Sequence, residues 1–81
     1  MTPQELADIL SRMYRDAQDG EKSITALRFG IRYAGEISRC GESVKEIVRL
    51  SRGVSDGYHR DCRKGVRLAR YVCLRPEIAH E

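Results

Sequence analysis

Apolar residues recur at every third or fourth position along this chain, and this spacing constrains the fold more than any other feature. The first two stripes are Leu6, Ile9, Leu10, Met13 and Ala17, and Ile24, Leu27, Ile31, Ala34 and Ile37. Such spacing places apolar side chains on one face of an α-helix, whereas a half-buried strand alternates apolar and polar residues. The 81 residues are enough for one domain. We therefore expect an all-α fold, a compact domain of four to five helices.

The first two helical segments have clear start and stop signals. The motif "TPQE" at residues 2–5 combines a helix cap, a proline in the first turn and a glutamate three positions after the cap. It predicts a helix over about residues 3–17, which ends before Gly20. The second segment ends at "RCGES". Because glycine weakens a helix interior, Gly30 allows a break in this segment near Phe29.

The next part of the chain has the layout of a helix-turn-helix. The motif "SVKE", which starts at Ser43, is a second capping box and predicts a short helix ending near Arg52. Gly53 then lets the backbone turn, an apolar residue fills the corner, and Ser55 caps a final helix to about Val72. A helix pair joined by a tight, glycine-containing turn is typical of this motif. The spacing before Gly53 has one residue more than the commonest bacterial form.

The chain is expected to form one domain with a short tail. Residues 1–75 form the helical domain and residues 76–81 the C-terminal tail, because Pro76 prevents the last helix from continuing. No apolar run approaches the roughly 18 residues that a membrane span needs, and the N-terminus lacks the layout of a signal peptide. We therefore expect a cytoplasmic protein that does not associate with membranes.

The positive charge of the chain is concentrated in its second half. The formal net charge is only +3, but residues 43–75 carry nine basic side chains against three acidic ones, a local excess of +6. Residues 1–42 carry six basic and seven acidic side chains. A positive field confined to one part of a small domain favours a negatively charged partner such as nucleic acid.

The last helix has two distinct faces, which counting in steps of three and four separates. The inward stripe is expected to be Tyr58, Cys62, Val66, Ala69 and Val72 or Cys73. The opposite, basic face carries Arg60, Arg63, Lys64, Arg67 and Arg70, with His59 beside the helix start. An ordinary solvated face is the alternative interpretation of these charges. Gly65 lets another helix approach closely or bends the last helix; the alternative is a defect that the helix merely tolerates. The tyrosines expected at the edge of the core, rather than as platforms for stacked bases, are Tyr14, Tyr33 and Tyr71.

The basic face is a candidate surface for duplex DNA, because the first turns of the second helix in a helix-turn-helix enter the major groove. The candidates for contacts with base edges are His59, Arg60, Arg63 and Lys64. The candidates for contacts with phosphates are Arg67, Arg70, Arg49 and Lys45. If four to five phosphates are neutralised, log K should fall against log salt concentration with a slope of roughly −4.

No set of residues in the sequence supports catalysis or metal binding. The chain offers no paired carboxylates, no Ser-His-Asp set and no phosphate-cradling loop, so we expect a protein that is not an enzyme. His59 and His80 are too far apart to suggest a metal site. Cys40, Cys62 and Cys73 include no C-x-x-C pair. We therefore expect reduced thiols, no cofactor and no metal.

The segment "ESVKEIVRLSRGVSDGYHRDCRKGVRLARYV", together with the upstream "ALRFGIRYAGEI", resembles a family of small prokaryotic proteins described as HTH-like domains. The family pattern is of the kind "HLFGI-KYA-EL…S-KEIV…G…SY…EI-KG-KLA-YV", and the resemblance covers residues 21–72. The residues that match are Tyr58, Lys64, Gly65, Leu68, Ala69, Tyr71 and Val72, whereas Asp61 and Cys62 depart from the pattern. The resemblance implies a helical domain that binds DNA, as a stand-alone protein or beside restriction-type enzymes.

Two functions are consistent with the sequence. The first is a DNA-binding helix-turn-helix-like module, a small transcriptional regulator or accessory DNA-binding protein that uses the basic face of its last helix. The alternative is a protein-protein interaction module, without enzymatic activity, whose basic helix docks on an acidic partner. Because such small domains commonly bind two half-sites as dimers, we also expect a homodimer, with the first helix as the candidate contact.

Overall fold

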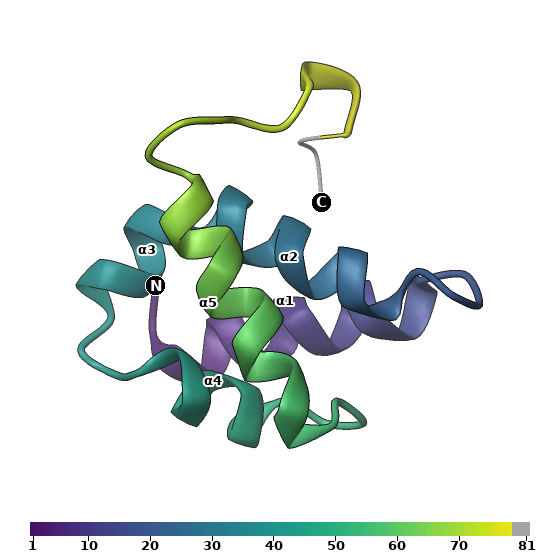
Figure 1. The fold of residues 1–81 in the computed structure, drawn as a ribbon. Helices are drawn as coiled ribbons and strands as arrows, with labels where there is room; N and C mark the ends of the chain where they lie inside the picture. Colours follow the sequence, from purple (N-terminus) through teal and green to yellow (C-terminus); the bar gives the residue numbers. More distant parts are fainter. Residues whose placement is uncertain (79–81) are drawn as a thin grey trace.

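The protein is built from short helices packed around one core. The computed structural model describes residues 1–78, which form five α-helices, two 3₁₀-helices and no β-strand. The elements are α1 (Pro3–Asp16), α2 (Lys22–Arg32), α3 (Ala34–Arg39), α4 (Val44–Leu50), η1 (Asp56–Tyr58), α5 (His59–Leu68) and η2 (Pro76–Ile78). In Figure 1, α5 lies across the front of the molecule, with α2 behind it and α4 below. The expected all-α fold of four to five helices is confirmed. Among residues 1–78, no helix has the length and apolar character needed to cross a membrane.

Helix α1 begins as its sequence predicts. The Thr2 hydroxyl accepts a hydrogen bond from the Glu5 amide at 3.1 Å, and the Glu5 carboxylate accepts one from the Thr2 amide at 2.8 Å. The capping box is therefore complete. Leu6, Leu10 and Met13 of α1 are buried in the core, which also contains residues of α2 and α4. The apolar stripe of α1 is thus used inside the domain.

The second helical segment breaks later than the sequence predicts. Helix α2 continues through Phe29 and Gly30 to Arg32, and Tyr33 separates it from α3 with φ −111° and ψ 20°. The expected break near Phe29 is wrong, because this side chain is only 1% exposed and its burial in the core holds the segment helical. Tertiary packing here outweighs the weak local preference of glycine.

Gly30 lets α2 and α5 cross at very short range, and it is buried at this crossing. A β-carbon on Gly30 would lie 2.1 Å from the Cys62 carbonyl oxygen, and one on Gly65 would lie 2.2 Å from the Leu27 carbonyl oxygen. Both distances are far below van der Waals contact, so only glycine fits at either position. Of the two roles expected for Gly65, the close approach of another helix is confirmed.

Helices α4 and α5 form the helix-turn-helix. After α4, Gly53 reverses the chain with a left-handed φ of 76°. Val54 fills the corner as expected, since it is 8% exposed and belongs to the core. Ser55, however, makes no side-chain cap, and the 3₁₀ turn η1 precedes α5, which begins at His59. The last helix therefore starts later than Ser55 suggested.

Helix α5 also ends earlier than the sequence predicts. It ends at Leu68 rather than near Val72, although one further turn follows, in which the Tyr71 amide donates to the Leu68 carbonyl oxygen at 2.8 Å. The chain then leaves the helix bundle (Figure 1). Val72 is 48% exposed and Cys73 is exposed, so the expectation that either belongs to the inward stripe is wrong.

Candidate nucleic-acid interface

Helix α5 is attached to the rest of the molecule by one face. Cys62 and Gly65 are buried, and Tyr58, Val66 and Ala69 are partly buried, which confirms these members of the inward stripe. Most of the contacts of α5 are with α2, and α4 also touches it. The opposite face of α5 is therefore free to meet a partner.

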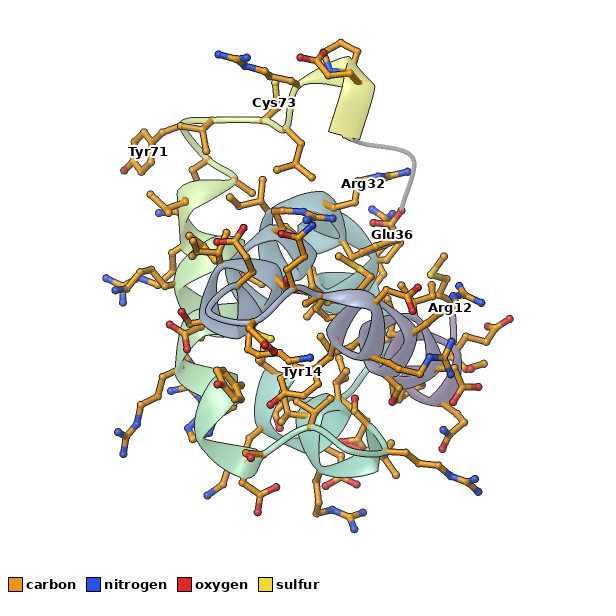
Figure 2. All side chains as sticks on the ribbon, turned by 90° about the vertical axis from the view of Figure 1, so that its right-hand side faces the viewer. Arg12, Tyr14, Arg32, Glu36, Tyr71 and Cys73 are labelled. Carbon is orange, nitrogen blue, oxygen red and sulfur yellow. The ribbon has the colours of Figure 1, made fainter. Side chains whose placement is uncertain are left out.

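We define the basic ridge as Arg60, Arg63, Lys64, Arg67 and Arg70. The first four lie on this opposite face of α5, and Arg70 lies in the turn that follows the helix. All five side chains belong to exposed residues. Within the described part of the chain, residues 1–78, none of the five takes part in an ion pair. Figure 2 shows nitrogen-tipped side chains projecting from α5 away from the other helices. The ridge therefore presents positive charge that no carboxylate in these residues neutralises.

His59 lies at the start of α5 and has a structural contact of its own. Its Nδ1 lies 2.7 Å from the Asp56 carbonyl oxygen. If Nδ1 carries the proton, this nitrogen donates to the carbonyl and Nε2 is the ring atom left to meet a partner. Asp61 follows in the first turn, where the positive end of the helix dipole favours a carboxylate.

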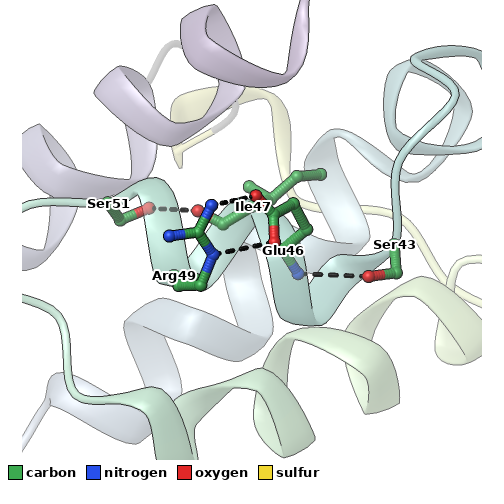
Figure 3. A network of polar contacts seen from close by, with 5 residues as sticks. All are labelled: Ser43, Glu46, Ile47, Arg49 and Ser51. Carbon is green, nitrogen blue, oxygen red and sulfur yellow. Dashed lines mark hydrogen bonds and ion pairs between the residues drawn. The ribbon is translucent and has the colours of Figure 1, made fainter.

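The two α4 residues predicted to hold phosphates differ in their surroundings. Lys45 is exposed. The Arg49 guanidinium instead donates to both carboxylate oxygens of Glu46, with Nε 2.8 Å from Oε1 (Figure 3). This hydrogen bonding holds the pKa of the Glu46 carboxyl below its ordinary value and raises the pKa of Arg49. Part of the charge of Arg49 is thus already compensated.

The capping box predicted for α4 forms only in part. The Ser43 hydroxyl accepts a hydrogen bond from the Glu46 amide at 3.1 Å, as expected. The Glu46 carboxylate, however, points toward Arg49 and not back to the Ser43 amide (Figure 3). The guanidinium competes well with the backbone amide for this carboxylate, because it donates two charge-assisted hydrogen bonds where the amide could donate one. The other predicted hydrogen bond of the capping box, from the Ser43 amide to the Glu46 carboxylate, is therefore wrong.

Tyr58 connects the start of α5 to α1. Its ring meets the Tyr14 ring edge to face, with 5.3 Å between the centroids and 67° between the planes. A hydrogen bond with Tyr14 raises the pKa of Tyr58 above its ordinary value. The Lys22 ammonium lies 4.5 Å from the centre of the Tyr14 ring and donates to the Tyr14 carbonyl oxygen at 2.6 Å. These contacts attach the segment that directly precedes α5 to α1 and so help to position the first turn of α5.

Of the three tyrosines expected at the edge of the core, Tyr71 is the one that the sequence placed wrongly. Tyr14 is partly buried and Tyr33 is 4% exposed, as expected for edges of the core, but Tyr71 is 81% exposed. In Figure 2 its ring points away from the helices. One signal in the sequence was available: Tyr71 follows Lys64 and Arg67 at helical spacing, which places it with the basic face and not with the core.

A hollow of about 670 Å³ opens beside the C-terminal end of the basic ridge. Its lining consists of Lys64, Val66, Arg67, Leu68, Arg70 and Tyr71. Three of these residues are positively charged and none is negatively charged. The chemistry of the hollow therefore suits an anionic group that also makes apolar contacts.

The cysteines show no sign of a redox or metal centre in the described part of the chain. Cys62 is buried, and this burial raises the pKa of its thiol to about 12. Cys40 is partly buried and unpaired, as is the exposed Cys73. Among residues 1–78, no three potential metal ligands come together. The expectation about His80 falls outside the described residues.

Comparison with known proteins identifies the family. Residues 2–75 match the family described as an HTH-like domain. The match extends beyond residues 21–72, where the sequence resemblance was noted, and takes in α1. No curated protein and no solved structure matches the chain. Because the family match covers almost the whole helical part, the chain belongs to the HTH-like domain family.

Proposed function

We propose that this protein binds duplex DNA through the basic ridge and acts as a small transcriptional regulator or an accessory DNA-binding protein. One observation carries the proposal: the ridge consists of five exposed cationic residues, four on the open face of α5 and Arg70 in the turn that follows it, without ion pairs among residues 1–78. The helix that bears them is the second helix of a helix-turn-helix, the element that enters the major groove in such proteins. Membership of the HTH-like domain family supports the same function.

The two halves of the ridge have different tasks in this proposal. The first turns of α5 enter the groove, so Arg60, Arg63 and Lys64 face base edges, together with His59. Arginine suits this task because its guanidinium forms two parallel hydrogen bonds with guanine. Contacts of Arg67 and Arg70 with phosphates supply affinity that does not depend on the sequence.

Helix α4 makes a smaller contribution. Lys45 is exposed and contacts the DNA backbone, whereas Arg49 must share its charge with Glu46. Neutralisation of four to five phosphates gives a plot of log K against log salt concentration with a slope of roughly −4. A shallower slope would assign fewer of these residues to the interface.

We also propose a homodimer that reads two half-sites and whose subunits meet through α1. The apolar stripe of α1 is buried in the core. A dimer contact through α1 therefore uses the first two turns of its outward face, where the Gln4 side-chain amide donates to the Asp8 carboxylate at 2.9 Å. Sedimentation equilibrium at rising protein concentration tests whether dimers form.

Charge reversal on the ridge tests the function. Arg63→Glu and Arg67→Glu, singly and together, are titrated against a fluorescent duplex at about 50 mM salt, with anisotropy as the readout. Each single reversal should weaken binding about tenfold or more, because a phosphate or base contact is replaced by repulsion. The double variant should not bind.

Arg12→Glu is the matched control, because it makes the same change of charge on an exposed residue of α1 (Figure 2). Its affinity should stay within about twofold of the wild-type value. Equal losses in Arg12→Glu and Arg63→Glu would contradict a localised interface. Failure of the unaltered protein to bind any duplex near 50 mM salt would contradict the proposal and favour an acidic protein partner.

A further inference from the structure

The C-terminal end of the basic ridge has a chemistry that positive charge alone does not explain. Tyr71 is 81% exposed and Val72 is 48% exposed, so two large side chains lie in solvent side by side. Burying a tyrosine ring would be favourable, yet the structure leaves this one beside Arg67 and Arg70, in the lining of the 670 Å³ hollow. The exposed ring is therefore placed where a partner of the ridge would meet it.

The backbone keeps Tyr71 in line with the ridge. After α5 ends, the Ala69 amide donates to the Gly65 carbonyl oxygen at 3.0 Å and the Tyr71 amide to the Leu68 carbonyl oxygen at 2.8 Å, so the helical winding continues for one turn. Tyr71 follows Lys64 by seven residues and Arg67 by four, and residues at these spacings share one side of a helix. Tyr71 thus extends the ridge by one position.

The length of the ridge decides what Tyr71 can reach. Arg60 and Tyr71 are eleven residues apart, which corresponds to about 16 Å along a helix. The major groove is about 12 Å wide. When α5 enters the groove with its first turn and lies at an angle to the direction of the groove, its far end therefore reaches the wall, which is the sugar-phosphate backbone.

We propose that the Tyr71 hydroxyl donates a hydrogen bond to a phosphate of the DNA backbone, which occupies the hollow beside Arg67 and Arg70. This inference rests on the proposed function and adds an uncharged contact to it. The positively charged lining complements a phosphate, and the apolar part, Val66 and Leu68, suits the adjoining sugar. A tyrosine hydroxyl is one of the groups that commonly bind DNA phosphates.

Two substitutions separate the hydroxyl from the ring. Tyr71→Phe and Tyr71→Ala are compared with the unaltered protein in duplex titrations over a range of salt concentrations. Tyr71→Phe should weaken binding about fivefold, the size expected for one hydrogen bond, and Tyr71→Ala little more than that. Neither should change the salt slope, because a hydroxyl releases no counterion, whereas Arg67→Ala should reduce its magnitude by about 0.9.

The controls address folding and the neighbouring side chain. Tyr71 is almost fully exposed, so both variants should unfold at the same temperature as the unaltered protein. Val72→Ala, which shortens the adjacent exposed side chain, should bind duplex normally.

The possible outcomes discriminate between this inference and the proposed function. Normal binding by Tyr71→Phe with weak binding by Tyr71→Ala would overturn the inference in favour of a ring contact. A preference for single-stranded over duplex DNA that is lost in Tyr71→Ala would overturn it in favour of base stacking. If Arg63→Glu weakens binding as expected and both Tyr71 variants bind normally, the inference fails and the proposed function stands. If the unaltered protein binds no duplex, both fail.

Discussion

Single glycine residues control how this domain packs. Gly53 provides a left-handed turn, with φ of 76°. Gly30 and Gly65 have ordinary backbone angles, and each removes a side chain that would collide with the backbone of the other helix. The sequence showed that glycine interrupts helical segments, but whether it breaks a helix or lets two helices meet depends on what lies opposite. A pattern along one chain does not contain that information.

The crossing of α2 and α5 gives a prediction at the residue scale. Gly65→Ala should lower the free energy of unfolding by about 2 kcal/mol, because the cost of overpacking exceeds the gain of about 1 kcal/mol in helix propensity. Gly30→Ala should act in the same direction.

Gly35→Ala is the matched control: its β-carbon would meet only the flexible end of Arg39, at 3.3 Å. Stability of Gly35→Ala should stay unchanged or rise by up to about 1 kcal/mol. Urea denaturation measures all three, and equal stabilities would contradict the described crossing.

The Glu46–Arg49 pair gives a second prediction at this scale. Glu46→Gln keeps the size of the side chain and removes the charge that compensates Arg49. Duplex affinity should rise about threefold and the salt slope should steepen by up to about 0.9, because Arg49 becomes available to a phosphate. Asp19→Asn removes the same charge from an exposed position in the α1–α2 loop and should have a smaller effect. If the two variants bind duplex equally, Arg49 has no special part in the interface.

At the scale of helices, local signals predicted the starts of α1 and α4 correctly, but neither the start nor the end of α5. The caps at Thr2 and Ser43 are formed as expected, because a side-chain oxygen and an amide three residues later are fixed by the sequence alone. The end of α5 depends on where the neighbouring helices stop covering it, and Val72 is already 48% exposed. The basic face of α5 was predictable from spacing, since its members share one side of one helix. Tyr71 was not placed correctly, because an aromatic residue was expected to be buried.

The cap of α1 links its stability to pH. Hydrogen bonds from Thr2, chiefly from its backbone amide, hold the pKa of the Glu5 carboxyl below its ordinary value of 4.5. The pKa is lower in the folded chain, so the stabilisation is fully present above pH 4.5 and is lost as the pH falls through the folded-state value. The pKa of Glu46 is shifted in the same direction.

Thermal unfolding followed by circular dichroism checks this dependence. The midpoint of the unaltered protein should fall as the pH drops below the ordinary glutamate pKa. Glu5→Gln should be less stable near neutral pH, because it lacks the charged cap, and should lose less stability on acidification. An identical loss of stability in Glu5→Gln and the unaltered protein would show that the capping box contributes nothing to the acid response.

At the scale of the whole molecule, the residues that form the core and the residues that form the basic ridge are separate. Helices α1, α2 and α4 supply most of the core, and α5 is attached to them by its inner face. This arrangement displays the basic ridge without using its side chains for folding. Substitutions on the ridge should therefore change binding and leave the unfolding midpoint almost unchanged, the opposite of the result expected for Gly30 and Gly65.

The most direct test of the ridge as a DNA-binding surface is an amide NMR titration of the folded protein with a short duplex at about 50 mM salt. We predict that the shifted amides fall in residues 59–71, with smaller changes near Lys45, and that Arg12 and Asp19, which lie outside the ridge and the proposed dimer contact, stay unchanged. Shifts concentrated on α1, or no shifts at all, would contradict the account.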